Sequence, residues 1–135
     1  MDSDFEINVS VAMATYNGEK YIREQINSIL ENLNSNDELI ISDDGSKDQT
    51  LNIIKQYQIN DKRIKLIKGP KLGVKQNFAN AIQNTKGKYV FLADQDDIWM
   101  KDKVKIVIDT FKNNNFRQEL KENGIAWTDL PILDT

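Results

Sequence analysis

Apolar side chains recur along this chain with two periods, one typical of strands and the other typical of helices. Apolar residues at every second position predict a strand over residues 7–14. Over residues 19–33 the apolar positions lie three or four apart, which predicts a helix. The same alternation continues, with further strands expected at 38–42, 63–67 and 89–93 and further helices at 48–57, 74–82 and 104–111.

Four strand–helix units in succession predict an α/β fold, with a parallel-dominated sheet and helices on both faces. A fifth strand is expected at 125–128, and Ser46 with Gln49 has the form of a capping box before the second helix. The length of 135 residues fits one domain, 1–135. Because the last residues are apolar and no closing helix follows them, we expect the chain to be the N-terminal part of a longer polypeptide.

Charge and composition narrow the chemistry that the chain can carry. The net charge is −3, so no overall basic field points to nucleic acid as a partner. The chain has neither cysteine nor histidine, so carboxylates must carry any metal or acid–base chemistry. Residues 1–6 lack the basic and apolar regions of a signal peptide, and no apolar run approaches the roughly 18–20 residues that span a bilayer. We therefore expect a cytoplasmic domain.

The strongest chemical signal is a group of carboxylates at the end of the apolar strand at 89–93. Asp94, Asp96 and Asp97 follow that strand closely, and each ionised carboxylate raises the cost of ionising the next. A divalent cation removes this cost, because hard cations such as Mg²⁺ are held by carboxylates together with substrate phosphates. The pattern predicts a metal-bridged phosphate site. The alternative is a solvated loop beside a helix N-terminus, where acidic residues are favourable.

Two further segments are expected at the same end of the sheet as these carboxylates. Residues 14–18 follow the first strand and residues 42–46 follow the second, and open α/β sheets bind ligands where parallel strands end. Tyr16 offers a flat face for a nucleotide base, and Asp44 offers an acceptor for a base N–H. Taken alone, each segment also fits an ordinary turn, and Tyr16 fits a half-buried aromatic residue.

Trp99 is interpreted as a core anchor, and the basic residues between 62 and 71 as a solvated strand edge.

Motifs that the sequence lacks exclude other classes of nucleotide- or phosphate-binding protein. No Gly-x-Gly-x-x-Gly follows the first strand and no Walker P-loop is present, which excludes those two nucleotide sites. A phospho-receiver domain would carry its acidic pair after the first strand, where this chain has Ala14, Thr15 and Tyr16.

Four blocks of sequence, in this order, resemble the family 2 inverting glycosyltransferases, which have the GT-A fold. They are residues 9–17, 38–48, 73–78 and 93–99, and the resemblance covers about residues 7–111. The Ala-Asp-Gln-Asp-Asp-Ile-Trp form of the last block is similar to bacterial rhamnosyltransferase-like members that assemble surface polysaccharides. The resemblance implies a GT-A, Rossmann-like sheet with strand order 3-2-1-4.

The resemblance also implies a nucleotide-diphosphate sugar, linked to UDP or dTDP, as the donor. Tyr16 would stack on the base, and Asp44 would hydrogen-bond it. Asp94 and Asp96 would form the DxD pair that holds Mn²⁺ or Mg²⁺ on the diphosphate, with Asp97 as a neighbouring carboxylate. The metal would neutralise charge on the departing nucleoside diphosphate. The residues expected at the nucleotide are Ala14, Thr15, Tyr16, Asp44, Asn77 and Asp94.

For the parent protein, the resemblance implies sugar transfer with inversion to a glycan or lipid-linked acceptor, in bacterial surface-polysaccharide synthesis at the inner face of the cell membrane. The family's catalytic base lies well beyond the DxD motif, so we expect it beyond Thr135. The alternative is a non-catalytic nucleotide-sugar-binding module or an inactive fragment. We also expect residues 125–135 to be poorly ordered or to cause self-association, because their apolar side chains would pack against a missing half.

Overall fold

The computed structural model describes residues 7–94 and 97–113, which are built around a four-stranded sheet. Neighbouring strands are parallel and follow the order β3-β2-β1-β4. The expected parallel α/β fold and the expected strand order are confirmed, whereas the strand expected at 125–128 lies outside the described residues. The strands are β1 (Val9–Thr15), β2 (Glu38–Asp43), β3 (Ile64–Lys68) and β4 (Tyr89–Ala93).

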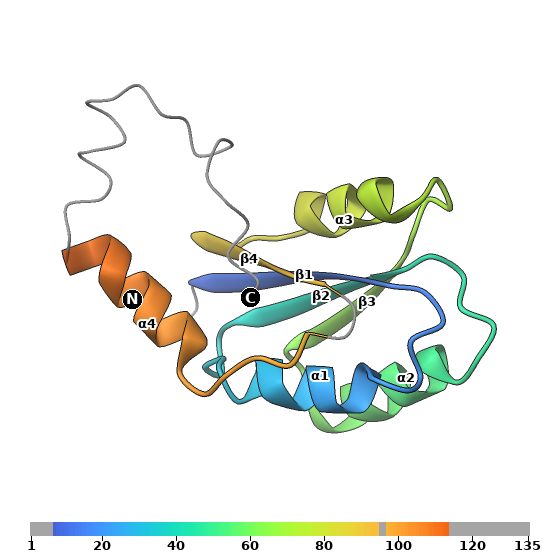
Figure 1. Ribbon diagram of the computed structural model, residues 1–135, viewed down its shortest axis with the longest axis horizontal. Coiled ribbons are helices and arrows are strands. Elements are labelled where there is room, and N and C mark those ends of the chain that lie inside the picture. Colours follow the sequence, from blue (N-terminus) through green and yellow to red (C-terminus); the bar gives the residue numbers. More distant parts are fainter. Residues whose placement is uncertain (1–6, 95–96, 114–135) are drawn as a thin grey trace.

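A helix follows each strand, and the helices cover both faces of the sheet (Figure 1). α1 and α2 lie on one face and α3 lies on the other; α4 extends the first layer, because Val104 and Ile108 join its core. In the described part of the chain, no helix is both long enough and apolar enough to cross a membrane. The helices are α1 (Ile22–Leu30), α2 (Thr50–Asn60), α3 (Val74–Gln83) and α4 (Lys103–Asn113).

The main hydrophobic core lies between the sheet and the layer of α1, α2 and α4. β1 contributes Val9, Val11 and Met13, which share one face because side chains alternate along a strand. The isoleucines of α1 at positions 22, 26 and 29 form the opposing stripe, three or four residues apart. All of these side chains are at most 2% exposed, so this face provides the larger share of apolar burial.

The face of the sheet under α3 is smaller and more polar. Its apolar cluster includes Ala12 from β1 and Ala81 from α3, which are short side chains that let the helix approach the sheet closely. Ser42 of β2 is fully buried, and its hydroxyl donates to Oδ1 of Asn77 on α3 at 2.6 Å. Because a buried polar group costs free energy unless it is bonded, such pairs favour one specific placement of α3.

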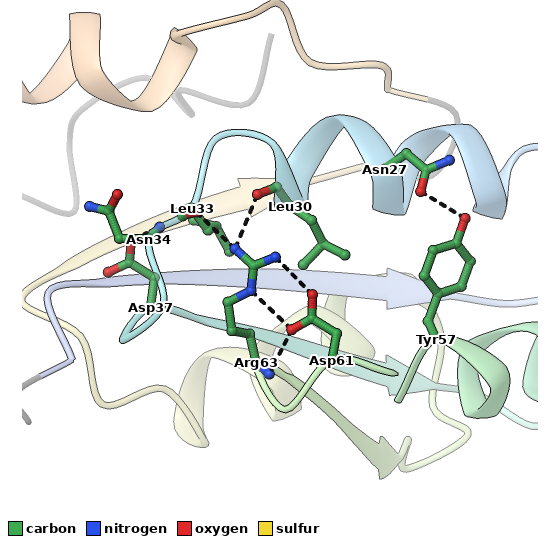
Figure 2. Close-up of polar contacts among 8 residues, drawn as sticks. All are labelled: Asn27, Leu30, Leu33, Asn34, Asp37, Tyr57, Asp61 and Arg63. Carbon is green, nitrogen blue, oxygen red and sulfur yellow. Dashed lines mark hydrogen bonds and ion pairs between the residues drawn. The ribbon is translucent and has the colours of Figure 1, made fainter. Parts of the chain in front are cut away.

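At the amino end of the sheet, where the strands begin, Arg63 joins the segment before β3 to the end of α1 (Figure 2). Its guanidinium donates to Asp61 at 2.7 and 2.9 Å, and to the carbonyl oxygens of Leu30 and Leu33 at 3.2 and 2.8 Å. The hydrogen-bonded ion pair lowers the pKa of Asp61 and raises the pKa of Arg63. The interpretation of the basic residues as a solvated edge is therefore wrong for Arg63. Lys65 is exposed on this edge, and its ammonium pairs with the buried carboxylate of Glu38 at 3.0 Å.

The capping box expected at Ser46 and Gln49 does not form. α2 begins at Thr50, and Oδ1 of Asp48 accepts hydrogen bonds from the backbone N–H and the hydroxyl of Thr50 at 2.9 and 2.6 Å. Partial burial opposes ionisation of Asp48, but these bonds outweigh it and hold the pKa of the carboxyl below its ordinary value. Ser46 is instead used by the loops at the carboxyl end of the sheet.

Candidate functional site

The carboxyl ends of β1, β2 and β4 meet at one end of the sheet, as the sequence predicted. In the register of β1, Thr15 pairs with the last residue of β2, and Met13 pairs with the last residue of β4. Tyr16, Asp44 and Asp94 are the next residues along these three strands. The chain thus brings an aromatic ring and two carboxylates, widely separated in sequence, to the same end of the sheet.

Hydrogen bonds join the loop after β1 to the loop after β2. The backbone N–H of Asn17 donates to Ser46 Oγ, and the backbone N–H of Lys47 donates to Asn17 Oδ1, both at 2.8 Å. The N–H of Gly18 donates to Thr50 Oγ1, also at 2.8 Å. Asn17 has a φ of 51°, a left-handed conformation that asparagine tolerates better than most residues. The two loops therefore form one unit and are not independent surface turns.

The two adjacent aspartates at the end of β2 have different surroundings. Asp43 is 4% exposed, and its Oδ1 accepts from the hydroxyls of Thr15 and Ser46 at 2.9 and 2.6 Å. Its Oδ2 accepts from the backbone N–H groups of Gly45 and Ser46 at 3.0 and 2.8 Å. Sequence reasoning gave Asp43 no role, whereas the structure makes it the acceptor that shapes this loop.

Asp44 is only partly buried and can be reached from outside. Its Oδ1 accepts a hydrogen bond from the backbone N–H of Lys71 at 2.7 Å, which orients the carboxylate. The close approach depends on Gly69, because a Cβ at that position would lie 2.5 Å from Asp44 Oδ1 and 2.4 Å from Asn77 Oδ1. The packing role of Gly69 could be recognised only in the tertiary structure.

Three of the residues predicted at the nucleotide are buried. Ala14, Thr15 and Asn77 are 6%, 1% and 2% exposed, whereas Tyr16 is 48% exposed. The amide of Asn77 donates to the carbonyl oxygen of Thr15 at 3.4 Å, and that oxygen also accepts from the backbone N–H of Asp44 at 3.0 Å. The structure thus separates an accessible group, Tyr16 and Asp44, from buried residues that support it.

The acidic segment, residues 94–97, begins where β4 ends. The carboxylate-bearing Asp94 is exposed, and its carbonyl oxygen accepts from the backbone N–H of Asp97 at 3.2 Å. The same carbonyl accepts from the side-chain amide of Gln25 on α1. Asp96 lies outside the described residues. Sequence reasoning missed Gln25. A glutamine among the isoleucines of an apolar helix face is unusual, and this pattern could have indicated a specific polar contact.

The donor set of this segment matches the chemistry of a hard divalent cation. Asp94 and Asp97 supply carboxylate oxygens, and Mg²⁺ or Mn²⁺ takes such oxygen ligands together with those of phosphates. Among the residues that the structure describes, no three acidic side chains are grouped closely enough to hold an ion by themselves. Two described carboxylates beside an open end of the sheet fit a cation that is shared with a ligand's phosphates.

Trp99, just beyond the acidic segment, is a core residue, as expected. It is 5% exposed and packs against Phe91 with ring centroids 5.9 Å apart. The ammonium of Lys103 lies 4.4 Å from the centroid of the Trp99 ring, a cation–π arrangement. This anchor attaches the chain after the acidic segment to the main core.

A parallel sheet of this order, with helices on both faces, is the architecture of GT-A glycosyltransferases. A family model described as glycosyl transferase family 2 matches residues 10–119, and the chain belongs to that family. The dTDP-rhamnosyl transferase RfbG of Shigella flexneri is similar, with 42% identity over 110 residues, which cover 76% of this chain and 38% of RfbG.

Solved structures show the same fold. Staphylococcus aureus TarS 1-349 in complex with UDP has a TM-score of 0.68 and 29% identity, covering 81% of this chain and 33% of that one. The mannosyltransferase PcManGT from Pyrobaculum calidifontis, solved with GDP-Man and Mn²⁺, has a TM-score of 0.72 and 20% identity, covering 83% of this chain and 34% of that one. The chain spans about two fifths or less of the length of each of these proteins.

Proposed function

We propose that the chain binds a nucleotide-diphosphate sugar for a glycosyltransferase that transfers the sugar, with inversion, to a glycan or lipid-linked acceptor. The observation that carries the proposal is the convergence of Tyr16, Asp44 and Asp94 at one end of the sheet, with Tyr16 and Asp94 exposed and Asp44 partly exposed. The family membership and the likeness to RfbG and to TarS with UDP support a UDP- or dTDP-linked donor.

In this proposal, the base of the nucleotide lies between the loops after β1 and β2. Tyr16, which is 48% exposed, offers its ring for stacking. Asp44 accepts a hydrogen bond from a base N–H; its Oδ1 already accepts from Lys71, which leaves Oδ2 to face the ligand. Burial makes Ala14, Thr15 and Asn77 supporting residues that position this pair, so their expected binding role is an indirect one.

The diphosphate is proposed to lie beside the acidic segment. Asp94, Asp96 and Asp97 would hold Mn²⁺ or Mg²⁺, with Asp94 and Asp96 as the DxD pair. When bound, the cation would supply Lewis-acid stabilisation of the charge that grows on the departing nucleoside diphosphate. These residues would hold the cation against the diphosphate. Asp94 would face the ribose or the metal.

The acceptor side of the reaction is proposed to come from the parent polypeptide beyond this chain. The catalytic base that deprotonates the acceptor hydroxyl is expected beyond Thr135. A nucleotide-sugar donor and a lipid-linked acceptor would place the parent protein in the cytoplasm, at the inner face of the bacterial membrane, in surface-polysaccharide synthesis. The self-association expected from residues 125–135 concerns a segment outside the described residues and stays a prediction.

Calorimetry with UDP and with dTDP tests the proposal directly. Both titrations are performed with Mn²⁺ and, as the matched control, with EDTA. We expect measurable affinity that is higher with Mn²⁺, because the cation bridges acidic side chains and the diphosphate. Equal affinity in Mn²⁺ and in EDTA would disprove the metal assignment, and no binding of either nucleotide would disprove the proposed function.

The alternative is a nucleotide-sugar-binding module without catalytic activity. Hydrolysis of UDP- and dTDP-sugars by the 135-residue chain with Mn²⁺ separates the two. Binding without turnover is expected for the chain alone. Hydrolysis at the rate of a complete enzyme would show that the base lies within these residues.

A further inference from the structure

One side of α1 carries polar residues that bind the backbone of the chain after β4. Gln25, Ser28 and Asn32 are spaced three and four residues apart, so they form a row along one face of the helix and its C-terminal end. We call these three residues the α1 polar row. Gln25 is fully buried and Ser28 is 7% exposed. Both side chains are polar, although they lie beside the isoleucines of the main core.

Each member of the α1 polar row contacts backbone groups after β4. The amide of Gln25 donates to the carbonyl oxygen of Asp94. Ser28 Oγ accepts from the backbone N–H of Trp99 at 2.9 Å. Asn32 donates to the carbonyl oxygen of Met100 at 3.2 Å and accepts from the backbone N–H of Val104 at 3.1 Å. The row therefore holds the chain at Asp94 and again from Trp99 onward.

Gln25 has the contact that matters for the acidic segment. The carbonyl oxygen of Asp94 is shared between the Gln25 amide and the backbone N–H of Asp97, so Gln25 bears directly on the hydrogen bond that links the two described carboxylate residues. The row's other contacts, at Trp99 and beyond, lie outside this segment. Gln25 is thus the member through which α1 can set where Asp94 and Asp97 lie.

The position is a poor one for a glutamine if stability alone is considered. Oε1 of Gln25 is buried, and no described residue donates a hydrogen bond to it. A buried oxygen without a hydrogen bond lowers the stability of the fold. An apolar residue of similar size on this face of α1 would avoid that cost. Residues that break local stability rules in this way occur mainly where function requires them.

We infer that Gln25 is a positioning residue for the metal-bridged diphosphate: its amide, fixed by α1, holds the Asp94 carbonyl and so sets Asp94 and Asp97 for the cation. This inference rests on the proposed function, because it assumes that the acidic segment binds a cation and a diphosphate. Gln25 touches neither of them. It acts through the backbone of Asp94, and outer groups of this kind commonly change metal affinity on the order of 10–100-fold.

The test uses Gln25→Met, which keeps the size and helix propensity of the side chain but removes the donor. The first readout needs no ligand: amide hydrogen exchange by NMR should be about tenfold faster at Asp97, because its acceptor is no longer held. The Trp99 and Val104 amides serve as internal controls and should change little, since Ser28 and Asn32 remain. Unchanged exchange at Asp97 would overturn the inference.

The second readout is calorimetry with UDP, in Mn²⁺ and in EDTA. Gln25→Met should lose about tenfold or more of the affinity measured in Mn²⁺ and keep the affinity measured in EDTA. If Gln25 has only a structural role, the substitution should lower the affinities in Mn²⁺ and in EDTA together, or change neither. Either result would overturn the inference. Ser10→Ala is the matched control, because it also removes a buried polar contact, at the opposite end of the sheet, and should leave both affinities unchanged.

Failure of the proposed function would be visible separately. If the wild-type chain binds neither UDP nor dTDP, the proposed function falls and the positioning role falls with it, even if the Asp97 amide exchanges faster in the variant. If Gln25→Met does not fold, as judged by circular dichroism, Gln25→Leu takes its place. Leucine also favours the helix and has no donor for the Asp94 carbonyl, so the same two readouts apply.

Discussion

The two ends of the sheet use charged side chains in opposite ways. At the amino end, Arg63 is bonded to Asp61 and to two carbonyl oxygens (Figure 2), and Glu38 is 1% exposed with three donors around it. At the carboxyl end, Asp94 is exposed and Asp44 is partly exposed. Charges at the first end stabilise the fold, whereas those at the second are available to a ligand. Substitutions at the two ends should therefore separate stability from binding.

The largest effect is expected at the carboxyl end for Asp96→Ala. This change should abolish the Mn²⁺-dependent part of the UDP or dTDP affinity, because the diphosphate loses its bridging cation. If the Asp96 carboxylate serves only the cation, the free energy of unfolding should change by less than about 0.5 kcal/mol. Calorimetry and urea unfolding measure the two quantities. Asp109→Ala, on the exposed side of α4, is the control, and a Mn²⁺ response retained by Asp96→Ala would contradict the assignment.

At the amino end, Arg63→Ala should lower stability and leave nucleotide binding unchanged. It removes the ion pair with Asp61 and the two bonds to the end of α1, and should lower the free energy of unfolding by about 2–3 kcal/mol. Nucleotide affinity of the folded fraction should stay unchanged. Urea unfolding compares the variant with Lys62→Ala, an exposed neighbour that should have little effect. A loss of affinity with stability intact would break the contrast between the two ends.

A smaller binding effect is expected for Tyr16→Ala. Loss of a stacked ring should reduce nucleotide affinity by about 1–3 kcal/mol, by analogy with aromatic stacking on nucleic-acid bases. Tyr16→Phe keeps the ring and should keep most of the affinity. Tyr21→Ala is a matched control, since Tyr21 is 47% exposed and Tyr16 is 48% exposed. If the alanine variants at 16 and 21 bind UDP equally well in calorimetry, Tyr16 does not stack.

The smallest effect is a pH-dependent one at Glu38. Burial raises its pKa, but hydrogen bonds from Ser10, Lys86 and Lys65 outweigh that and hold the pKa below its ordinary value of 4.5. Because the folded state has the lower pKa, the ionised carboxylate stabilises the fold at neutral pH, and this contribution disappears as the pH falls below 4.5.

Glu38→Gln should therefore be less stable than wild type by about 1 kcal/mol at neutral pH. The difference should shrink on acidification, as thermal unfolding between neutral and acidic pH can show. Glu24→Gln, at an exposed position of α1, serves as the control and should show no such trend. A difference that stays constant with pH would mean that the ionisation of Glu38 does not contribute.

The sequence alone determined the kind and order of the elements and the end of the sheet at which the site lies. Apolar periods are local properties, so β4 was placed correctly at Tyr89–Ala93 and the other strands within a residue or two. In a parallel sheet the carboxyl ends must fall together, and the sequence therefore predicted that Tyr16, Asp44 and Asp94 lie at the same end of the sheet.

Only the tertiary structure decided which polar side chains support the site and which face a ligand. Asp43 and Asp44 are adjacent and identical in type, yet Asp43 is buried and accepts hydrogen bonds from the end of β1 and from its own loop, whereas Asp44 is accessible. Gln25 and Asp94 are 69 residues apart, and Arg63 meets the end of α1 about 30 residues away. Such pairings depend on how helices pack on the sheet, and no local pattern of residues encodes them.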